Sequence, residues 1–110
     1  MITWADFEAI DFRAGTIVRV EDFPEARKPA YKLWIDFGPE LGIKRSSAQI
    51  TSFYTKDELT GRQILAVVNF LPKQIAGFVS EVLVTGFVSD GSGVVLVQSE
   101  RRVPNGTRLA

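Results

Sequence analysis

Most of the side chains that carry out catalysis at neutral pH are absent from this sequence of 110 residues. It contains no cysteine and no histidine. It therefore has no thiolate nucleophile and no disulfide bond, and it lacks the commonest metal ligand and the commonest general base. Its carboxylates are not clustered, and no glycine-rich phosphate-binding motif is present. We therefore expect no enzyme activity, no metal site and no cofactor.

The basic residues could bind a ligand instead. Thirteen Lys and Arg residues balance thirteen Asp and Glu residues, so no global field attracts a polyanion and nucleic-acid binding would need a local basic patch. The alternative is that these are ordinary solvated charges. Because neighbouring strand residues face opposite sides, at most one of Lys44 and Arg45 can face a groove. The candidates for such a patch are Arg27, Lys28, Lys44, Arg45 and Lys73.

An apolar loop is the second candidate site. Residues 71–81 form a connection of eleven residues that contains Ile75 and Phe78, and loops of this length are often functional. Exposed apolar side chains rimmed by polar groups could hold a segment of an unfolded chain. The alternative is that Ile75 and Phe78 fold back onto the protein as a plug. The candidate peptide-binding residues are Trp34, Asn69, Gln74, Ile75 and Phe78.

The elements that would position these residues follow from the hydrophobic pattern. Alternating or continuous apolar runs predict strands, and Gly15 inside the first run suggests a bulge or a sharp bend. Capping-box patterns at Thr3/Asp6 and Thr55/Glu58 each predict a short helix. The expected strands cover residues 12–20, 31–37, 43–50, 63–70 and 82–88, with a further apolar run at 94–98.

This order of elements predicts an all-β fold, a five-stranded OB-fold Greek-key barrel with short helices at the N-terminus and between strands 3 and 4. We expect one domain over residues 1–110. An OB-fold presents ligands to strands 2 and 3 and to the loops after strands 1 and 4. The long apolar loop follows strand 4, so the candidate residues converge on one surface.

Two apolar stretches remain outside the expected barrel. Trp4, Phe7 and Ile10 lie three residues apart on one face of the N-terminal helix, and Val95 and Val97 belong to the last apolar run. The helical stripe could dock on its own barrel or on another subunit. A barrel of this size has little spare core to bury both stretches, so these residues predict a homodimer interface with twofold symmetry.

The sequence contains four recognisable motifs, namely Asp11–Val18, Phe23–Arg27, Ser46–Ile50, and the block from Val68–Phe70 to Ser80–Leu83. Together they resemble the CsaA secretion-chaperone family, a branch of the tRNA-binding OB-fold domains related to the C-terminal domain of methionyl-tRNA synthetases. The resemblance implies a homodimer that binds unfolded preproteins and assists their export, with the export translocase as a further partner.

The wider family binds tRNA, which makes a tRNA-binding module the alternative. The sequence departs from the synthetase pattern at Ile75–Ala76 and Ser80–Val82, where side chains replace a basic residue or bare backbone. This departure ranks peptide binding above tRNA binding. The tRNA-binding candidates are Arg27, Lys28, Lys44, Arg45, Lys73 and Ser80.

The chain carries no sign of a membrane segment. Residues 1–6 lack the basic and apolar regions of a signal peptide. No apolar run approaches the roughly 20 residues that a membrane span needs. We therefore expect a cytoplasmic protein with no membrane insertion.

Overall fold

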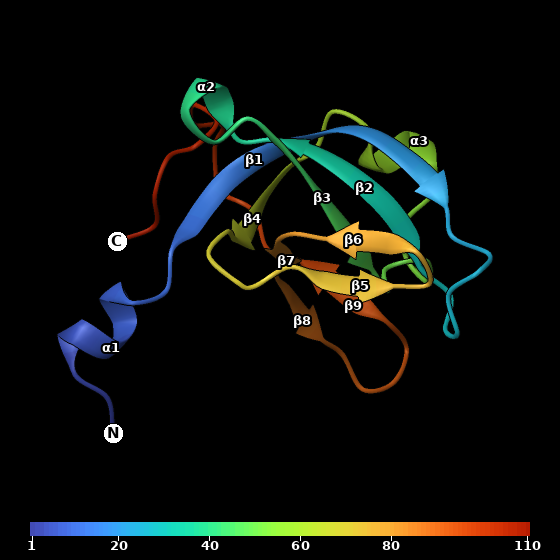
Figure 1. The fold of residues 1–110 in the computed structure, drawn as a ribbon, viewed down its shortest axis with the longest axis horizontal. Coiled ribbons are helices and arrows are strands. Elements are labelled where there is room, and N and C mark those ends of the chain that lie inside the picture. Colours follow the sequence, from blue (N-terminus) through green and yellow to red (C-terminus); the bar gives the residue numbers. More distant parts are fainter.

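The computed structural model describes residues 1–110, and its centre is an antiparallel five-stranded sheet curled into a barrel (Figure 1). The spatial order is β3-β2-β1-β4-β7. The backbone N–H of Glu81 donates to Arg45 O at 2.8 Å, which nearly closes the barrel between β3 and β7. The predicted all-β, OB-fold-like barrel is confirmed. Its strands are β1 (Phe12–Asp22), β2 (Tyr31–Asp36), β3 (Ile43–Ala48), β4 (Gln63–Val67) and β7 (Leu83–Val84).

Shorter elements surround the barrel. Two helices begin with the predicted capping boxes, in which the Thr3 and Thr55 hydroxyls accept from the backbone N–H three residues later. A third helix, in a stretch predicted to be a turn, has Pro39 in its first turn. No helix is both long enough and apolar enough to cross a membrane. The elements are α1 (Trp4–Glu8), α2 (Gly38–Leu41), α3 (Lys56–Leu59), the hairpin β5 (Lys73–Ile75) with β6 (Phe78–Ser80), and the hairpin β8 (Gly86–Val88) with β9 (Val94–Leu96).

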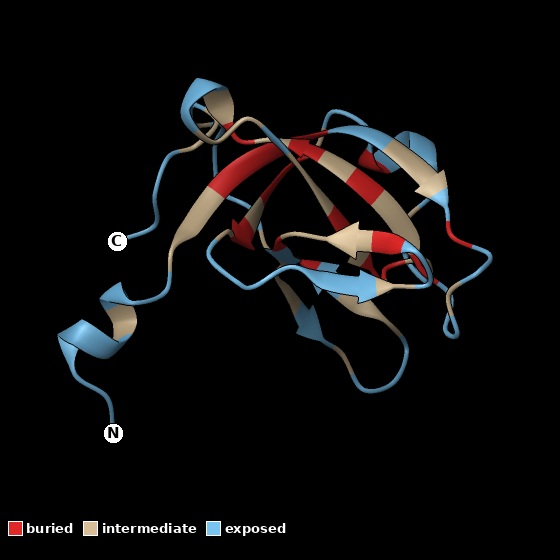
Figure 2. Ribbon diagram, in the orientation of Figure 1, coloured by how far each residue is buried: buried red, intermediate tan, exposed pale blue.

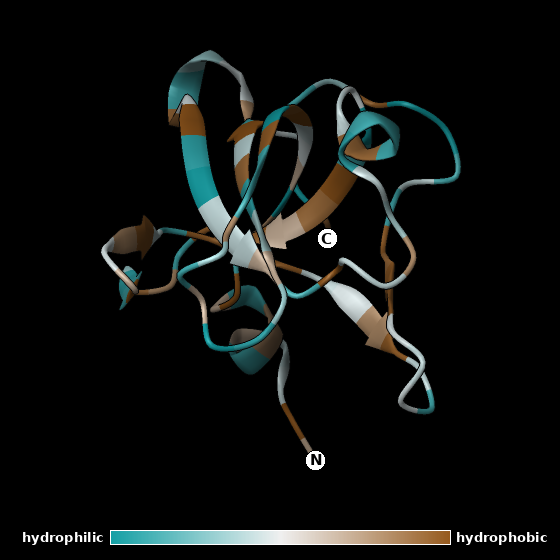
Figure 3. Cartoon of the chain, turned by 90° about the vertical axis from the view of Figure 1, so that its right-hand side faces the viewer, coloured by the Kyte–Doolittle hydropathy of each residue, from teal (hydrophilic) through white to brown (hydrophobic).

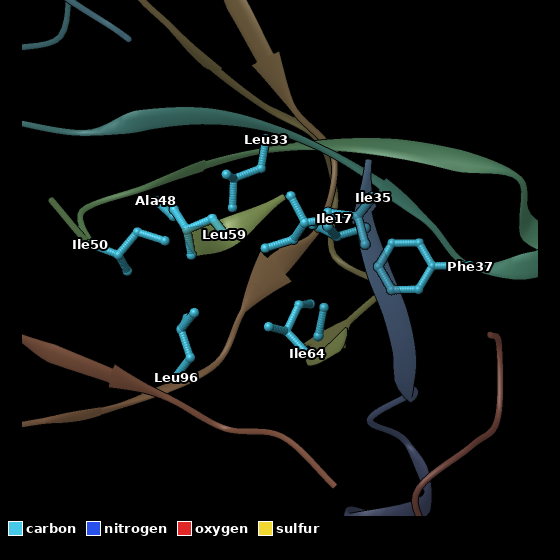
Figure 4. Packing of buried hydrophobic residues seen from close by; sticks show 11 residues of the cluster. Ile17, Leu33, Ile35, Phe37, Ala48, Ile50, Leu59, Ile64 and Leu96 are labelled. Atoms are coloured by element: carbon cyan, nitrogen blue, oxygen red, sulfur yellow. The ribbon is translucent and has the colours of Figure 1, made fainter. Parts of the chain in front are cut away.

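The main core fills the inside of the barrel. Strand β2 and the residue after it contribute Leu33, Ile35 and Phe37, at the alternate positions expected for a half-buried strand. Ile17 of β1 and Ile64 of β4 meet them from the other side (Figure 4). The buried positions of the sheet face inward, while the loops and most of α1 are exposed (Figure 2). Burial of this apolar surface is the main stabilising contribution to the barrel.

The predicted boundaries were wrong in the second half of the chain. Strand β4 ends at Val67 rather than residue 70, because the next backbone N–H, that of Val68, donates to Asp11 O outside the sheet. The run 82–88 is divided at Thr85, whose N–H and hydroxyl both donate to Leu65 O. Residues 71–81, expected as a loop, contain the β5–β6 hairpin.

Gly15 does not mark a bulge. A Cβ atom there would lie 2.6 Å from the Phe37 ring, so the glycine permits the core to approach the backbone closely. The bulge lies further along β1, where the register with β2 shifts between Ile17 and Arg19. The extra residue, Val18, is exposed. The shift turns Arg19 towards the outer face of β2, beside Trp34.

Candidate binding surface

The β5–β6 hairpin packs against the outer face of β2 and β3 (Figure 1). Its anchor is Phe78, whose ring meets Phe23 at 5.6 Å and Trp34 at 5.8 Å between centroids, both edge to face. Phe78 is only 7% exposed. These aromatic residues, with Ala26, Ala30 and Ile75, form what we call the aromatic cluster, which is separate from the main core. Of the two alternatives for Phe78, the structure therefore supports the plug: the side chain is buried between the hairpin and the barrel.

Three cations lie over the aromatic cluster. Arg19 stacks on Trp34 at 4.6 Å, Lys32 lies 4.9 Å from the Phe23 centroid, and Arg45 lies 5.5 Å from that of Phe78. Arg19 and Arg45 also pair with carboxylates, whereas Lys32 has none within ion-pair distance. Cations over aromatic faces are attracted by the ring quadrupole. The result is a basic face on β2 and β3, the two strands that an OB-fold uses for ligands, and on the neighbouring β1.

Of these three cations, only Arg45 is among the residues predicted from the sequence to bind nucleic acid. Arg45 lies directly opposite Trp34 on β3, so it faces the cluster, whereas Lys44 lies opposite Ile35 on the other side of the sheet. Arg19 and Lys32 were missed. Lys32 could have been found from the alternation of β2, because it lies two residues before Trp34 and shares its face. Arg19 could not have been found in this way, because the bulge at Val18 decides which face of β1 its side chain occupies.

The remaining basic candidates are dispersed. Arg27 and Lys28 are exposed in the connection between β1 and β2. Lys73 is exposed on β5, directly opposite Ser80 of β6. The Ser80 hydroxyl accepts from the backbone N–H of Ser47 at 3.0 Å. Ser80 therefore fastens the hairpin to β3. Two of the predicted tRNA-binding residues, Ser80 and Lys73, are thus neighbours across the hairpin.

A groove of about 660 Å³ lies beside the hairpin, between the end of β3 and the β7–β9 region. Its walls are largely apolar and include Ile75 from the hairpin. Polar groups of Ser47, Gln49, Ser80 and Glu81 also line it. This is the size and composition of a site for a small ligand or a short peptide segment. The apolar residues that line this groove include Leu71, Ile75, Val82, Val84, Val88 and Val94.

Glu81 connects the groove to the basic face. Its Oε1 atom accepts from the backbone N–H of Arg45 at 3.0 Å and lies 3.5 Å from Arg45 Nε. The Ser80 and Glu81 side chains accept hydrogen bonds from the backbone N–H groups of Ser47 and Arg45 at the edge of β3. Without them, these N–H groups would be free to pair with another strand. The hairpin is thus a wall shared by the groove and the aromatic cluster.

The predicted peptide-binding residues divide between these places. Ile75 lines the groove and Gln74 is exposed beside it, whereas Trp34 and Phe78 belong to the aromatic cluster. Asn69 lies elsewhere, where its Oδ1 accepts from Asp11 N at 3.0 Å and its Nδ2 donates to Ala9 O at 2.8 Å. Asn69 therefore positions α1, and both groups of its amide are already used.

The expected interface residues are mostly exposed. Helix α1 projects away from the barrel, and the chain end before it is strongly hydrophobic (Figures 1 and 3). Trp4 is 80% exposed, and Ile10 and Val95 are exposed as well. Phe7 stacks on Phe12 at 6.2 Å, which attaches the helix to β1. Val97 is half-buried, and its backbone pairs with Leu65 and Thr85.

Comparison with known proteins fits this arrangement. The family described as "putative tRNA binding domain" matches residues 12–108. The chain therefore belongs to this family of binding modules. The "Methionine--tRNA ligase" of Thermococcus onnurineus is 32% identical over 98% of this chain, but the chain spans only 14% of that protein's length. Those relatives are enzymes through their other domains.

Two solved structures are more similar in sequence to this chain than the methionine--tRNA ligase is. The CsaA chaperone of Bacillus anthracis is 54% identical over 100% of this chain and 99% of its own, with a TM-score of 0.94. The CsaA chaperone of Picrophilus torridus is 56% identical over the full length of both chains, with a TM-score of 0.93. The resemblance to CsaA chaperones is confirmed. The putative tRNA binding domain and the CsaA chaperones are non-catalytic modules, in agreement with the expected lack of enzyme activity.

Proposed function

We propose that this domain is a CsaA-type chaperone that binds apolar segments of unfolded preproteins in the groove. The observation that carries this proposal is the apolar lining of a 660 Å³ groove beside the β5–β6 hairpin. A chaperone needs an apolar surface that accepts varied segments, with polar groups at its rim for the client backbone. The similarity to CsaA chaperones supports this choice. In this proposal the protein acts as a cytoplasmic homodimer and delivers its clients to the export translocase.

A second candidate is tRNA binding on the basic face. Arg19 of β1, Lys32 of β2 and Arg45 of β3 each lie over an aromatic ring. Phosphate contacts from such cations dominate nucleic-acid affinity. The chain's membership of the putative tRNA binding domain family favours this function. The two candidates use different surfaces, so one experiment can test them separately.

The test is a binding titration of a labelled preprotein segment and of a tRNA, each at two salt concentrations. We expect peptide affinity to change little with salt, because apolar capture involves no counterion release, and tRNA affinity to fall steeply. A steep salt dependence for tRNA together with no peptide binding would reject the chaperone proposal and leave the tRNA candidate.

Matched variants assign each activity to its surface. Leu71 is 91% exposed and lines the groove, so Leu71→Asp should leave the fold intact and weaken peptide binding about ten-fold or more. Ile43→Asp is the control, since Ile43 is exposed outside the groove. Lys32→Gln should weaken tRNA binding and lower its salt slope by about 1. Lys56→Gln, at an exposed residue of α3 outside the basic face, should do neither. If a variant and its control had equal effects, the surface that the variant alters would not be the one that carries the activity.

A further inference from the structure

A second, smaller pocket lies on the segment that follows β9. It has a volume of about 180 Å³, and every residue that lines it is polar or charged. It shares no residue with the groove. A volume of this size is below that of sites for drug-sized ligands, so it can hold a small polar group only. The lining residues are Gln63, Gln98, Ser99, Glu100, Arg101 and Arg102.

Arginines dominate the charge around this pocket. Arg101 and Arg102 line it, and Arg62 reaches it through a hydrogen bond from Nη1 to Gln98 Oε1 at 3.4 Å. The single carboxylate, Glu100, is taken by Arg101, whose Nε lies 3.0 Å from both of its oxygens. Two guanidinium charges therefore remain without a carboxylate partner.

Arg62 and Arg102 are held in place by neutral groups. The Arg62 guanidinium lies 5.2 Å from the ring centroid of Tyr54, and its buried Nε has no hydrogen-bond partner. Arg102 donates from Nη2 to Thr16 Oγ1 at 2.9 Å and from Nη1 to Gly61 O at 3.4 Å. Their orientations are thus fixed without an anion, which lowers the entropic cost of binding one.

The backbone adds further donors. Residues 98–102 lie outside any helix or strand, and their N–H groups make no hydrogen bond within the chain. At both ends the segment is fastened to the barrel: Leu65 N donates to Val97 O at 3.0 Å, and Val103 N donates to Gln63 Oε1 at 3.0 Å. Consecutive free N–H groups beside fixed guanidinium groups are typical of oxyanion sites.

We propose that this pocket is a phosphate-binding site, formed by Arg62, Arg101, Arg102 and the backbone of residues 98–102. Its ligand is a single phosphate group, either free or carried by a nucleic-acid strand. Arginine is suited to this role because its planar fork can donate two parallel hydrogen bonds to phosphate oxygens. The site does not depend on the proposed groove and remains if peptide binding is disproved.

The test is a titration of the whole chain with sodium phosphate, followed by amide proton–nitrogen NMR, with sodium chloride at equal ionic strength as the reference. We expect saturable shifts at the amides of residues 98–102 and at the Nε–H of Arg62 in phosphate only. Arg62→Gln and Arg101→Gln should each weaken binding about ten-fold. The first removes a guanidinium that has no carboxylate partner, and the second leaves the Glu100 carboxylate unpaired in the pocket, where it repels an anion. Lys56→Gln removes one positive charge at an exposed residue of α3 outside the pocket and should have no effect.

Arg101 is exposed, so its variant remains informative even if Arg62→Gln folds poorly. A second titration with a short single-stranded oligoribonucleotide identifies the source of the phosphate. Shifts at the same amides assign the site to a nucleic-acid backbone, and shifts with phosphate alone assign it to the free ion. The proposal is overturned if neither ligand shifts these amides beyond chloride, or if both arginine variants bind as well as the unaltered chain. Amides of the groove, such as those of Ile75 and Ser80, report separately on the proposed function.

Discussion

Phe78 holds the β5–β6 hairpin against the barrel, because its ring is the only side chain of the hairpin that is buried. Replacing Phe78 by Ala should cost about 3 kcal/mol of the free energy of unfolding, at the lower end for buried aromatics, since the aromatic cluster is small. Ile75→Ala should cost less, because Ile75 is only half-buried. Urea denaturation of the three proteins measures both values. An unchanged midpoint for Phe78→Ala would contradict the packing described here.

Ala76 occupies an unfavourable backbone conformation. Its φ of 47° and that of Gly77, 82°, are both positive in the two-residue turn of the hairpin. Such turns favour Asn or Gly at the first position, and alanine there costs about 1 kcal/mol or more. Ala76→Asn should therefore raise the free energy of unfolding by about 1 kcal/mol, measured by urea denaturation. Gly77→Ala, the matched control, should lower it.

Residue-level predictions succeeded where the cause was local. The capping pairs Thr3/Asp6 and Thr55/Glu58 are three residues apart, and both formed as expected. The role of Asn69 could not be predicted, because its partners Ala9 and Asp11 lie about sixty residues earlier in the chain. Its position after an apolar strand gave no indication of them.

At the scale of elements, helix α3 depends on its capping box. The Thr55 hydroxyl accepts from Glu58 N at 3.2 Å, so Thr55→Ala should cost about 1 kcal/mol at neutral pH. The hydrogen bond from the Thr55 backbone N–H lowers the pKa of Glu58. A lowered pKa means that the carboxylate contributes stability above its unfolded-state pKa of about 4.3, and that this contribution is lost as the pH falls through the folded-state value.

The pH dependence is tested with Glu58→Gln, which keeps the shape of the side chain but cannot ionise. Urea denaturation at pH 7 and pH 3 should show a smaller loss of stability on acidification in this variant than in the unaltered chain. Glu25→Gln is the control, since Glu25 lies in an exposed connection and forms no ion pair. Equal pH dependence of the two variants would exclude Glu58 as the cause.

Strands with strict alternation were predictable, and those shaped by long-range contacts were not. The alternate spacing of Leu33 and Ile35 predicts β2, and both residues are buried in the core. The β5–β6 hairpin could not be predicted from the sequence, because Ala76–Gly77 is not one of the common turn pairs of two-residue hairpins. In addition, each of its strands has only three residues, too few to show a clear alternation. The break at Thr85 arises from hydrogen bonds to Leu65 on another strand.

At the scale of the whole molecule, the order of elements predicted the barrel because short connections leave few topologies open. The charge balance was less informative. A net charge of zero conceals the gathering of Arg19, Lys32 and Arg45 on one face, which depends on strand register. The groove could not be predicted either, since its walls combine the end of β3 with segments that lie twenty or more residues later.

Exposed apolar side chains on α1 and on the β8–β9 hairpin predict a homodimer. Besides Trp4, 80% exposed, and Val95, 44% exposed, the β8–β9 hairpin leaves Phe87 69% exposed. Isolated exposed apolar residues are common, but several large ones on short elements outside the five-stranded sheet are typical of an interface. We therefore expect a dimer with twofold symmetry, in which α1 and the β8–β9 hairpin meet the partner.

Sedimentation at micromolar concentration should show twice the mass of 12.2 kDa, and removal of residues 1–10 or the substitution Phe87→Asp should shift the equilibrium to monomer. Neither change removes a buried residue, so the core of the barrel should stay folded, as judged by its near-ultraviolet spectrum. Ile43→Asp introduces the same charge at a residue that is 58% exposed on β3, outside the predicted interface, and should leave the dimer intact. A monomer in the unaltered chain, or a monomer produced equally by Ile43→Asp, would show that this surface does not hold two copies together.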